Sequence, residues 1–181
     1  MAEHYVGVRD AKIGSWTSTG TYGTAYDLYG IRSVSVNRTV DTATLEGDDI
    51  RLATRQKGIA VEVQVEFVDE GGQNSANVMS VLTGGAITSD GSGEYVVTMD
   101  EDDTDSGPFG LTCKAKSSDN PDHEVMLFFP KLTITSGPNT TLGLNGWKLY
   151  SLTASGVADS TYGTHQVYTN TSAYTLTLPP T

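Results

Sequence analysis

The fold is decided by residues 58–67, which read Gly58-Ile59-Ala60-Val61-Glu62-Val63-Gln64-Val65-Glu66-Phe67. Successive side chains of a strand point to opposite faces, so this alternation predicts a strand with one apolar face and one polar, carboxylate-rich face. The apolar face must pack on a core, and we expect it to consist of Ile59, Val61, Val63, Val65 and Phe67. The polar face must meet water or a water-filled space. That acidic face becomes informative if several copies close a ring around a channel.

The composition describes an acidic chain that is rich in glycine and hydroxyl residues. Its 181 residues are enough for one domain with a sizeable core, and 20 glycines with abundant Ser and Thr favour strands and turns. A net charge of −11 argues against wrapping nucleic acid, which requires neutralising phosphates with basic side chains. Such a surface repels DNA instead. The plainer interpretation is that the acidity keeps the protein soluble.

Catalytic and metal-binding interpretations find little support in the motifs. The single cysteine, Cys113, cannot form a disulfide within the chain, and the three histidines are scattered away from it. The acidic run at 100–105 fails the EF-hand pattern, because its sixth residue is Asp105 rather than Gly and its twelfth is Leu111 rather than Glu. We therefore expect no catalytic residue, no metal and no cofactor.

Two further alternatives concern sugars. Glu62 and Glu66 lie four residues apart on one strand, about 13 Å at ~3.3 Å per residue, whereas glycosidase pairs need ~5–9.5 Å. Trp16, Trp147 and nine tyrosines leave open a carbohydrate-binding module with aromatic platforms.

No segment reaches the ~18 apolar residues of a membrane span, and the N-terminus lacks the apolar core of a signal peptide, so we expect synthesis and folding in a cytoplasm.

The pattern of turns and alternating segments predicts an all-β sandwich or barrel with one short flanking helix. The helix is expected at about 74–83, with Asn74 or Ser75 as its N-cap and Gly84 as its stop. Pro130 is expected at a sheet edge or a bulge, and residues 136–139 read as a loop. Strands are expected at residues 31–40, 58–67, 95–99, 109–116, 123–135 and 144–154.

These elements divide the chain into three parts. Residues 1–29 read as an N-terminal arm whose aromatic side chains need a surface to dock on. Residues 30–155 form the sandwich core, from which residues 39–57 project as a long charged loop or hairpin. Residues 156–181 read as a C-terminal arm or a terminal strand.

With this order of elements, the chain resembles the major tail proteins, or tail tube proteins, of long-tailed bacteriophages. The resemblance covers roughly residues 30–155. It is carried by Leu45-Glu46-Gly47-Asp48-Asp49 before the long strand, and by Thr83-Gly84-Gly85 after the short helix. It implies six copies per ring, rings stacked into a hollow tube, and one sheet per subunit in a continuous inner barrel.

The resemblance also assigns roles to residues. Glu62, Gln64 and Glu66 are expected to face the lumen and to repel DNA from the wall during ejection; the alternative is that they only solvate an outer face. Contact with the next ring is expected from Leu45, Glu46, Gly47, Asp48, Asp49 and Arg51. The terminal arms are expected to reach neighbouring subunits by adding strands.

The expected partners are further copies of this chain and the tape-measure and tail-terminator proteins of the phage, with DNA passing without specific binding and no membrane. The expected location is the virion tail, assembled in the host cytoplasm. Two alternatives stay open at this point: another virion β-protein, such as a capsid decoration or tail-terminator subunit, and a carbohydrate-binding or adhesin module. The sequence leaves open the host, the tail length, contractility, polymerisation without a template, the faces of the later strands and the role of residues 100–105.

Overall fold

The computed structural model of the chain describes residues 5–47, 50–69, 71–98, 106–118, 120, 122–142, 148–170 and 175–180. Side chains are described within these ranges except at residues 5–6, 42–47, 50–58 and 170. The acidic run at 100–105 and Trp147 lie outside the described residues.

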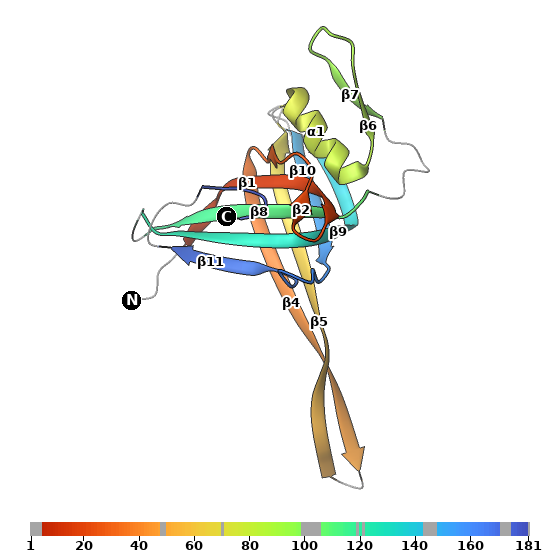
Figure 1. Cartoon of the computed structure of the whole chain (residues 1–181), viewed down its shortest axis with the longest axis vertical. Helices are drawn as coiled ribbons and strands as arrows, with labels where there is room; N and C mark the ends of the chain where they lie inside the picture. The colour runs from red at the N-terminus through yellow and green to blue at the C-terminus, as the bar shows by residue number, and fades with distance from the viewer. Residues whose placement is uncertain are drawn as a thin grey trace.

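The described residues form an all-β fold with one helix, as the sequence predicts (Figure 1). A nine-stranded sheet follows the order β2-β1-β8-β9-β10-β5-β4, with β3 paired to β1 and β11 paired to β9, and β6 and β7 form a separate ribbon. Every strand pair is antiparallel. The elements are β1 (Tyr5–Ser18), β2 (Thr21–Tyr22), β3 (Tyr26–Asp27), β4 (Ile31–Gly47), β5 (Ile50–Asp69), α1 (Gly72–Thr83), β6 (Ala86–Ser89), β7 (Tyr95–Thr98), β8 (Phe109–Ser117), β9 (Glu124–Leu142), β10 (Lys148–Gly156) and β11 (Gln166–Asn170).

Strand β9 divides the sheet into two layers. Its first half pairs with β8 on one side and β11 on the other, whereas its second half pairs with β10. In Figure 1, β1, β8 and β11 run across the view while β4 and β5 run down it, which is the arrangement of an orthogonal sandwich. Pro130 lies at the corner: Phe109 pairs with Leu132 and Leu111 with Phe129, so β9 carries an extra residue opposite Gly110. The predicted bulge at Pro130 is confirmed.

The lower layer consists of β4, β5, β10 and the second half of β9, and the upper layer of β1, β8, β11 and the first half of β9. The core lies between these two layers. From the lower layer, β5 contributes alternate residues that are at most 4% exposed, and β10 contributes Leu152 and Ala154. From the upper layer, β1, β8 and β9 contribute large apolar side chains that are at most 1% exposed. The buried residues of β5 are those predicted, Val61, Val63, Val65 and Phe67.

Ile59 departs from the predicted core, because it is 45% exposed. Ile59 lies two residues beyond the last pair between β5 and β10, Val61 with Gly156, where β5 leaves the sandwich and its core face is no longer buried. Beyond this point β4 and β5 pair only with each other and project from the body as a hairpin (Figure 1). Of the two forms predicted for residues 39–57, a loop or a hairpin, the described residues form the hairpin, with residues 39–47 paired to residues 50–60.

The N-terminal segment is not the arm that its composition suggests. Strand β1 pairs with β8 along its length, and Ala11 and Ile13 are at most 1% exposed. Two register shifts, between Val6 and Val8 and between Val8 and Asp10, interrupt its alternation. These irregularities hide the strand from a search for period two.

The helix α1 packs over one end of the sandwich through Ala76, Val78 and Leu82, which are all buried. Gly84 ends it in the left-handed conformation (φ 77°), as predicted. The predicted N-cap is wrong: Gly71 occupies that position and no side chain caps the helix. Asn74 and Ser75 are instead turned toward other elements.

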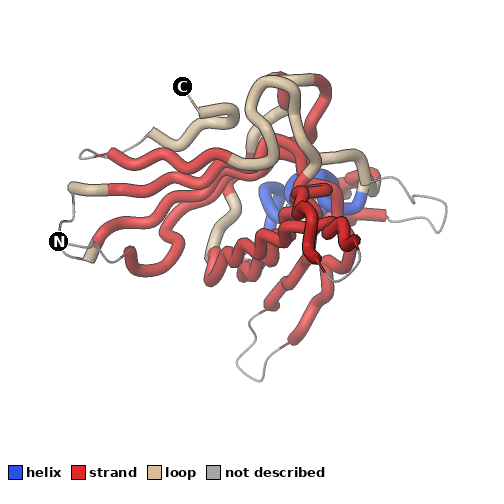
Figure 2. Tube along the Cα trace, turned by 90° about the horizontal axis from the view of Figure 1, so that it is seen from below, coloured by secondary structure: helices blue, strands red, loops and turns tan. Residues whose placement is uncertain are grey.

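The C-terminal residues lie against their own body. Strand β11 pairs with β9, Leu176 is 6% exposed, and Leu178 approaches β1 at Gly14. Within residues 156–181, for which the sequence suggests an arm or a terminal strand, the described part is the strand β11 followed by a packed segment. Figure 2, seen from below, shows strands extending to the side on which the two termini lie, with the helix α1 on the other side.

Candidate functional site: a polar strand face and a projecting hairpin

The solvent side of the lower layer is built from three rows of residues, each crossing β9, β10, β5 and β4 in that order. In every row, side chains from all four strands share one face because they are register partners. The rows are Asn139–Ser151–Glu66–Ser33, Ser136–Thr153–Gln64–Ser35 and Thr133–Ser155–Glu62–Asn37.

This face, which we call the polar face, contains hydroxyl, amide and carboxylate groups and no basic side chain. The predicted residues Glu62, Gln64 and Glu66 are all exposed and lie together along its third strand. Ser33 donates a hydrogen bond to Glu66 (3.4 Å), and the Gln64 amide donates to Glu62 (3.3 Å). A shallow open hollow of about 290 Å³ crosses the face between β4 and β9. The face therefore presents negative charge and neutral polar groups to whatever lies against it.

The layer that carries the polar face has two open edges. On one side β4 ends the strand order, and on the other the second half of β9, residues 133–142, has β10 on one side only among the described residues. Most side chains on both edges are exposed. An open strand edge presents unpaired backbone N–H and C=O groups and is a template for pairing with another chain.

The predicted ring-contact residues fall at the end of the β4–β5 hairpin. Leu45 pairs with Ala53, Glu46 with Arg51, and Gly47 with Ile50, so the backbone there is an antiparallel ladder with a register shift between Leu45 and Glu46. Asp48 and Asp49 lie outside the described residues. The structure thus places these residues at the far end of a projecting element, about 20 Å beyond Asp41 at ~3.3 Å per residue.

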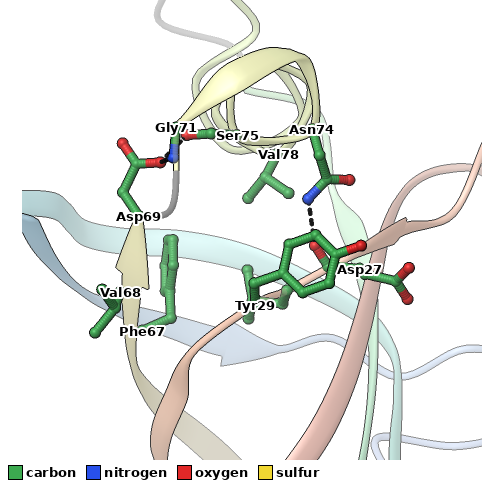
Figure 3. Close-up of a pocket in the computed structure, with 10 residues that line it drawn as sticks. Asp27, Tyr29, Phe67, Val68, Asp69, Gly71, Asn74, Ser75 and Val78 are labelled. Atoms are coloured by element: carbon green, nitrogen blue, oxygen red, sulfur yellow. Dashed lines mark hydrogen bonds between the residues drawn. The ribbon is translucent and has the colours of Figure 1, made fainter.

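The pocket beneath α1 is too small for a substrate (Figure 3). It has a volume of about 20 Å³ and lies between the helix, the end of β5 and the segment after β3. Such a volume holds one water molecule at most. The Asn74 side chain crosses its rim and donates a hydrogen bond to the Asp27 carbonyl oxygen (2.7 Å).

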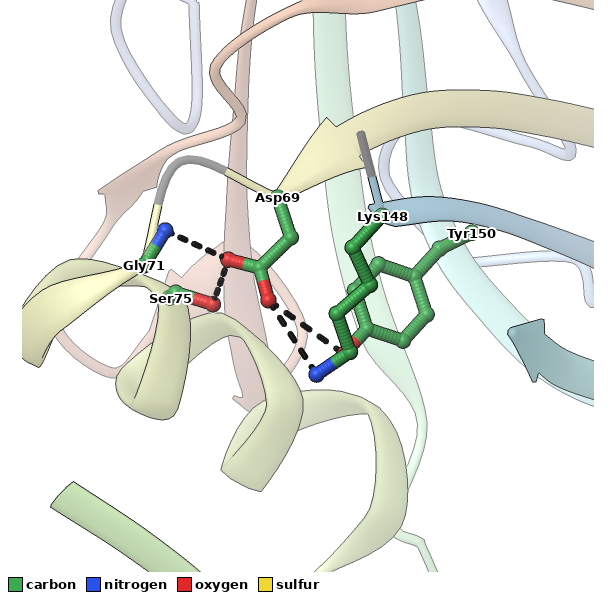
Figure 4. Close-up of polar contacts among 5 residues, drawn as sticks. All are labelled: Asp69, Gly71, Ser75, Lys148 and Tyr150. Atoms are coloured by element: carbon green, nitrogen blue, oxygen red, sulfur yellow. Dashed lines mark hydrogen bonds and ion pairs between the residues drawn. The ribbon is translucent and has the colours of Figure 1, made fainter. Parts of the chain in front are cut away.

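Beside this pocket, Asp69 ties the helix to the sheet (Figure 4). Its Oδ1 accepts hydrogen bonds from the Gly71 N–H (2.8 Å) and the Ser75 hydroxyl, and its Oδ2 meets the Lys148 ammonium (3.4 Å) and the Tyr150 hydroxyl (3.3 Å). Burial acts to raise the pKa of Asp69, but the hydrogen bonds from Ser75 and Gly71 and the charge of Lys148 outweigh it and hold that pKa below its ordinary value. The hydrogen bond with Tyr150 raises the pKa of Lys148. The arrangement is a structural clamp, because the Asp69 carboxylate joins the start of α1 to β10.

Other reactive groups are buried in structural positions. Burial raises the pKa of the Cys113 thiol to about 12, so its reactive thiolate is scarce. Burial, followed by the nearby Asp159 and Tyr162, raises the pKa of Tyr22, whose hydroxyl donates to the Pro130 carbonyl. Within the described ranges no group of three His, Cys, Asp or Glu side chains is arranged to hold a metal ion.

The aromatic residues give no open stacking platform at Trp16, because the Lys131 ammonium lies 4.0 Å from its ring centroid. In the part of the chain that the structure describes, no helix has the length and apolar character needed to cross a bilayer.

Alternation in β5 was sufficient to predict the acidic strand, and the other three strands were also predicted. The sequence did not show that their polar residues share one face with Glu62, Gln64 and Glu66. Ser33, Ser35, Ser151, Thr153 and Ser155 do alternate with apolar residues along their own strands. That pattern could have marked them as solvent-facing. Which strands are neighbours depends on topology, which the local pattern does not contain.

Comparison with known proteins adds no relative: no protein-family model matches the chain, and no curated protein matches it significantly.

Proposed function

We propose that the chain is a structural subunit that closes into hexameric rings and stacks into a tail tube, with the polar face lining the channel. The observation that carries this proposal is the combination of the polar face with an open strand edge on each side of it. A face meant only for solvation needs no open edges, whereas a wall segment of a closed barrel needs both.

The strand directions support closure of the ring by edge pairing. Strands β4, β5, β10 and the second half of β9 alternate in direction, so the two edge strands of this four-stranded layer run antiparallel to each other. When copies are arranged head to tail around an axis, β4 of one copy meets β9 of the next in an antiparallel pair, like every other pair in the sheet. The two open edges of the subunit therefore have the strand directions needed to pair with each other in neighbouring copies.

The chemistry of the polar face suits a channel for DNA. Six copies bring twelve carboxylates from Glu62 and Glu66 to the wall, surrounded by Ser, Thr, Asn and Gln side chains. Phosphates gain affinity by releasing counterions at basic side chains, and the polar face has none. DNA would slide past such a wall without adhering.

Electron microscopy of the purified protein tests the proposal directly. We expect the earliest fractions from size-exclusion chromatography to contain stacked rings or hollow tubes in negative stain. Discrete small oligomers would favour a capsid decoration or tail-terminator subunit. A monomer that binds glycans would favour the carbohydrate-binding alternative, and either result would contradict the tube.

A further inference from the structure

The two ends of the molecule differ in charge. Residues 31–57, which contain β4 and most of the hairpin, carry five basic and four acidic residues, so the rest of the chain carries a net charge of −12. Residues 58–113 contain eleven acidic residues and no basic one. In Figure 1 the hairpin lies at one pole of the long axis, whereas α1 and the β6–β7 ribbon lie at the opposite pole. Among the described side chains, the base of the hairpin carries Arg38 and the turn of the β6–β7 ribbon carries Asp90 and Glu94, so the two poles present opposite charges.

At the hairpin pole, an apolar stripe continues the core face onto the uncovered base of the hairpin. Val36, Val40 and Ile59 are 38–45% exposed, and Val40 and Ile59 are register partners. Arg38, which is also exposed, lies on the same face between Val36 and Val40 because it pairs with Val61. The hairpin base thus combines exposed apolar side chains with a guanidinium.

At the opposite pole, the β6–β7 ribbon has one face turned toward α1 and one face free. Tyr95 and Val97 line a groove beside the helix. The other face carries Val96, which is 46% exposed, and three further exposed side chains, Ala86, Thr88 and Thr98. The turn that joins the two strands adds the exposed carboxylates Asp90 and Glu94. A two-stranded ribbon is marginally stable unless something packs on it.

We infer that the hairpin base of one copy docks on the free face of the β6–β7 ribbon of a second copy. The two surfaces are complementary: Val36, Val40 and Ile59 cover Val96 and its neighbours, while Arg38 meets the carboxylates of Asp90 and Glu94. Because the surfaces lie at opposite poles, the contact repeats head to tail and does not close after two copies.

This inference rests on the proposed function, and it names the surface that receives the hairpin. In a stack of bodies, the ribbon pole of one copy comes level with the hairpin base of the next, and the distal part of the hairpin then overlaps the neighbour by about 20 Å. The opposite charges of the two poles set the direction in which copies stack. The distal end of the hairpin does not set it.

Disulfide cross-linking of a double variant tests the docking. With cysteines at both poles, V40C/V96C, each chain can join two others, so oxidation of the concentrated protein is expected to give a ladder of covalent multimers on a non-reducing gel. The native Cys113 is 1% exposed and stays unreactive. The matched control is V40C/V167C, because Val167 is 55% exposed but lies on β11, away from the ribbon. The control is expected to give no ladder beyond the dimer.

A charge swap tests the polar part of the contact. R38E is expected to lower the ladder yield about tenfold, and R38E with E94R is expected to restore it. R32E, the same change near the other end of β4, is expected to leave the yield unchanged.

The outcomes separate the docking from the tube. Tubes in the microscope without a V40C/V96C ladder overturn the docking and leave the proposed function standing. A ladder without rings or tubes supports the docking and contradicts the proposed function. If neither the ladder nor the tubes form, both the docking and the proposed function are overturned. A V40C/V167C ladder equal to the V40C/V96C ladder overturns the docking alone.

Discussion

Gly14 and Gly110 are register partners on β1 and β8, and each leaves room for a side chain that covers the sheet. A Cβ atom at Gly110 would clash with the ring of Tyr22, and one at Gly14 would lie 3.0 Å from Leu178. The Tyr22 ring cannot move freely, because its hydroxyl is bonded to the Pro130 carbonyl and its ring meets Phe128 edge-on. Space for these side chains, rather than backbone flexibility, explains the two glycines.

The substitution G110A is therefore expected to lower the free energy of unfolding by about 1–3 kcal/mol, the usual cost of forcing extra volume into a packed site. Urea denaturation followed by circular dichroism measures it. G107A is the control, since a Cβ at Gly107 meets no atom within 4 Å and the backbone there does not require glycine. Equal stability of the two variants would contradict the packing argument.

The Asp69 clamp predicts a stability difference that depends on pH. D69N removes the charged acceptor shared by Ser75, Gly71 and Lys148, and is expected to cost about 1–3 kcal/mol at neutral pH. Because the folded pKa of Asp69 is lowered, its contribution is present above the ordinary carboxyl value of 3.8 and is lost as the pH falls through the folded pKa.

The measurement compares urea unfolding of the wild type and of D69N at neutral pH and at progressively lower pH. The difference should shrink in the acid range, where the wild-type carboxyl becomes protonated. A difference that stays constant down to the lowest pH would show that the ionised carboxylate is not what the clamp uses.

At the scale of elements, the hairpin is separable from the body. Beyond the pair of Val61 and Gly156, β4 and β5 pair only with each other. A chain in which Asn-Gly replaces residues 42–57 is expected to keep its fold, because this dipeptide closes two-residue hairpins and no strand pairing of the body is lost. If the proposed function holds, it is also expected to lose stacking, because the distal hairpin that overlaps the neighbouring copy is gone and only the hairpin base remains to make the contact.

Circular dichroism and urea unfolding check the fold of the shortened chain, and negative stain checks its assembly. We expect single rings or free subunits in place of tubes. Tubes of normal length from the shortened chain would exclude residues 42–57 from the contact between rings.

The elements also show what local sequence can predict. The strand at residues 58–67 was predictable because its alternation is strict. Gly84 marked the end of the helix because glycine readily adopts the left-handed backbone conformation that ends a helix. Ile59 was assigned wrongly because alternation gives the face of a side chain, whereas its burial depends on whether β5 is still within the sandwich at that residue. Residues 136–139 carry turn signals, yet they lie within β9 at a register irregularity. The open edges were not predictable, since they arise from pairing between strands far apart in the sequence.

At the scale of the whole molecule, an acidic chain presents one face free of basic residues across four strands while its basic residues cluster elsewhere. Five of its eleven basic residues fall within residues 31–57. Net charge alone would explain solubility. The distribution is more specific, because it leaves a neutral-to-acidic wall on one face and opposite charges at the two poles.

The role of the polar face is tested in phage that carry both E62K and E66K. The two side chains are exposed and leave the core unchanged, so the subunits are expected to assemble into tubes of normal length. Six copies would then place twelve added cations on the channel wall, and each phosphate they neutralise would hold the DNA more strongly. Infectivity and the rate of DNA ejection are expected to fall, with recovery as the salt concentration rises.

Two controls separate charge from side-chain replacement. E62Q with E66Q removes the carboxylates without adding cations and is expected to leave ejection close to wild type. D122K adds a cation at an exposed position outside the polar face and is expected to have no effect. Wild-type infectivity of the double lysine variant would place Glu62 and Glu66 on an outer surface, because DNA confined within a channel cannot avoid a wall that binds phosphate.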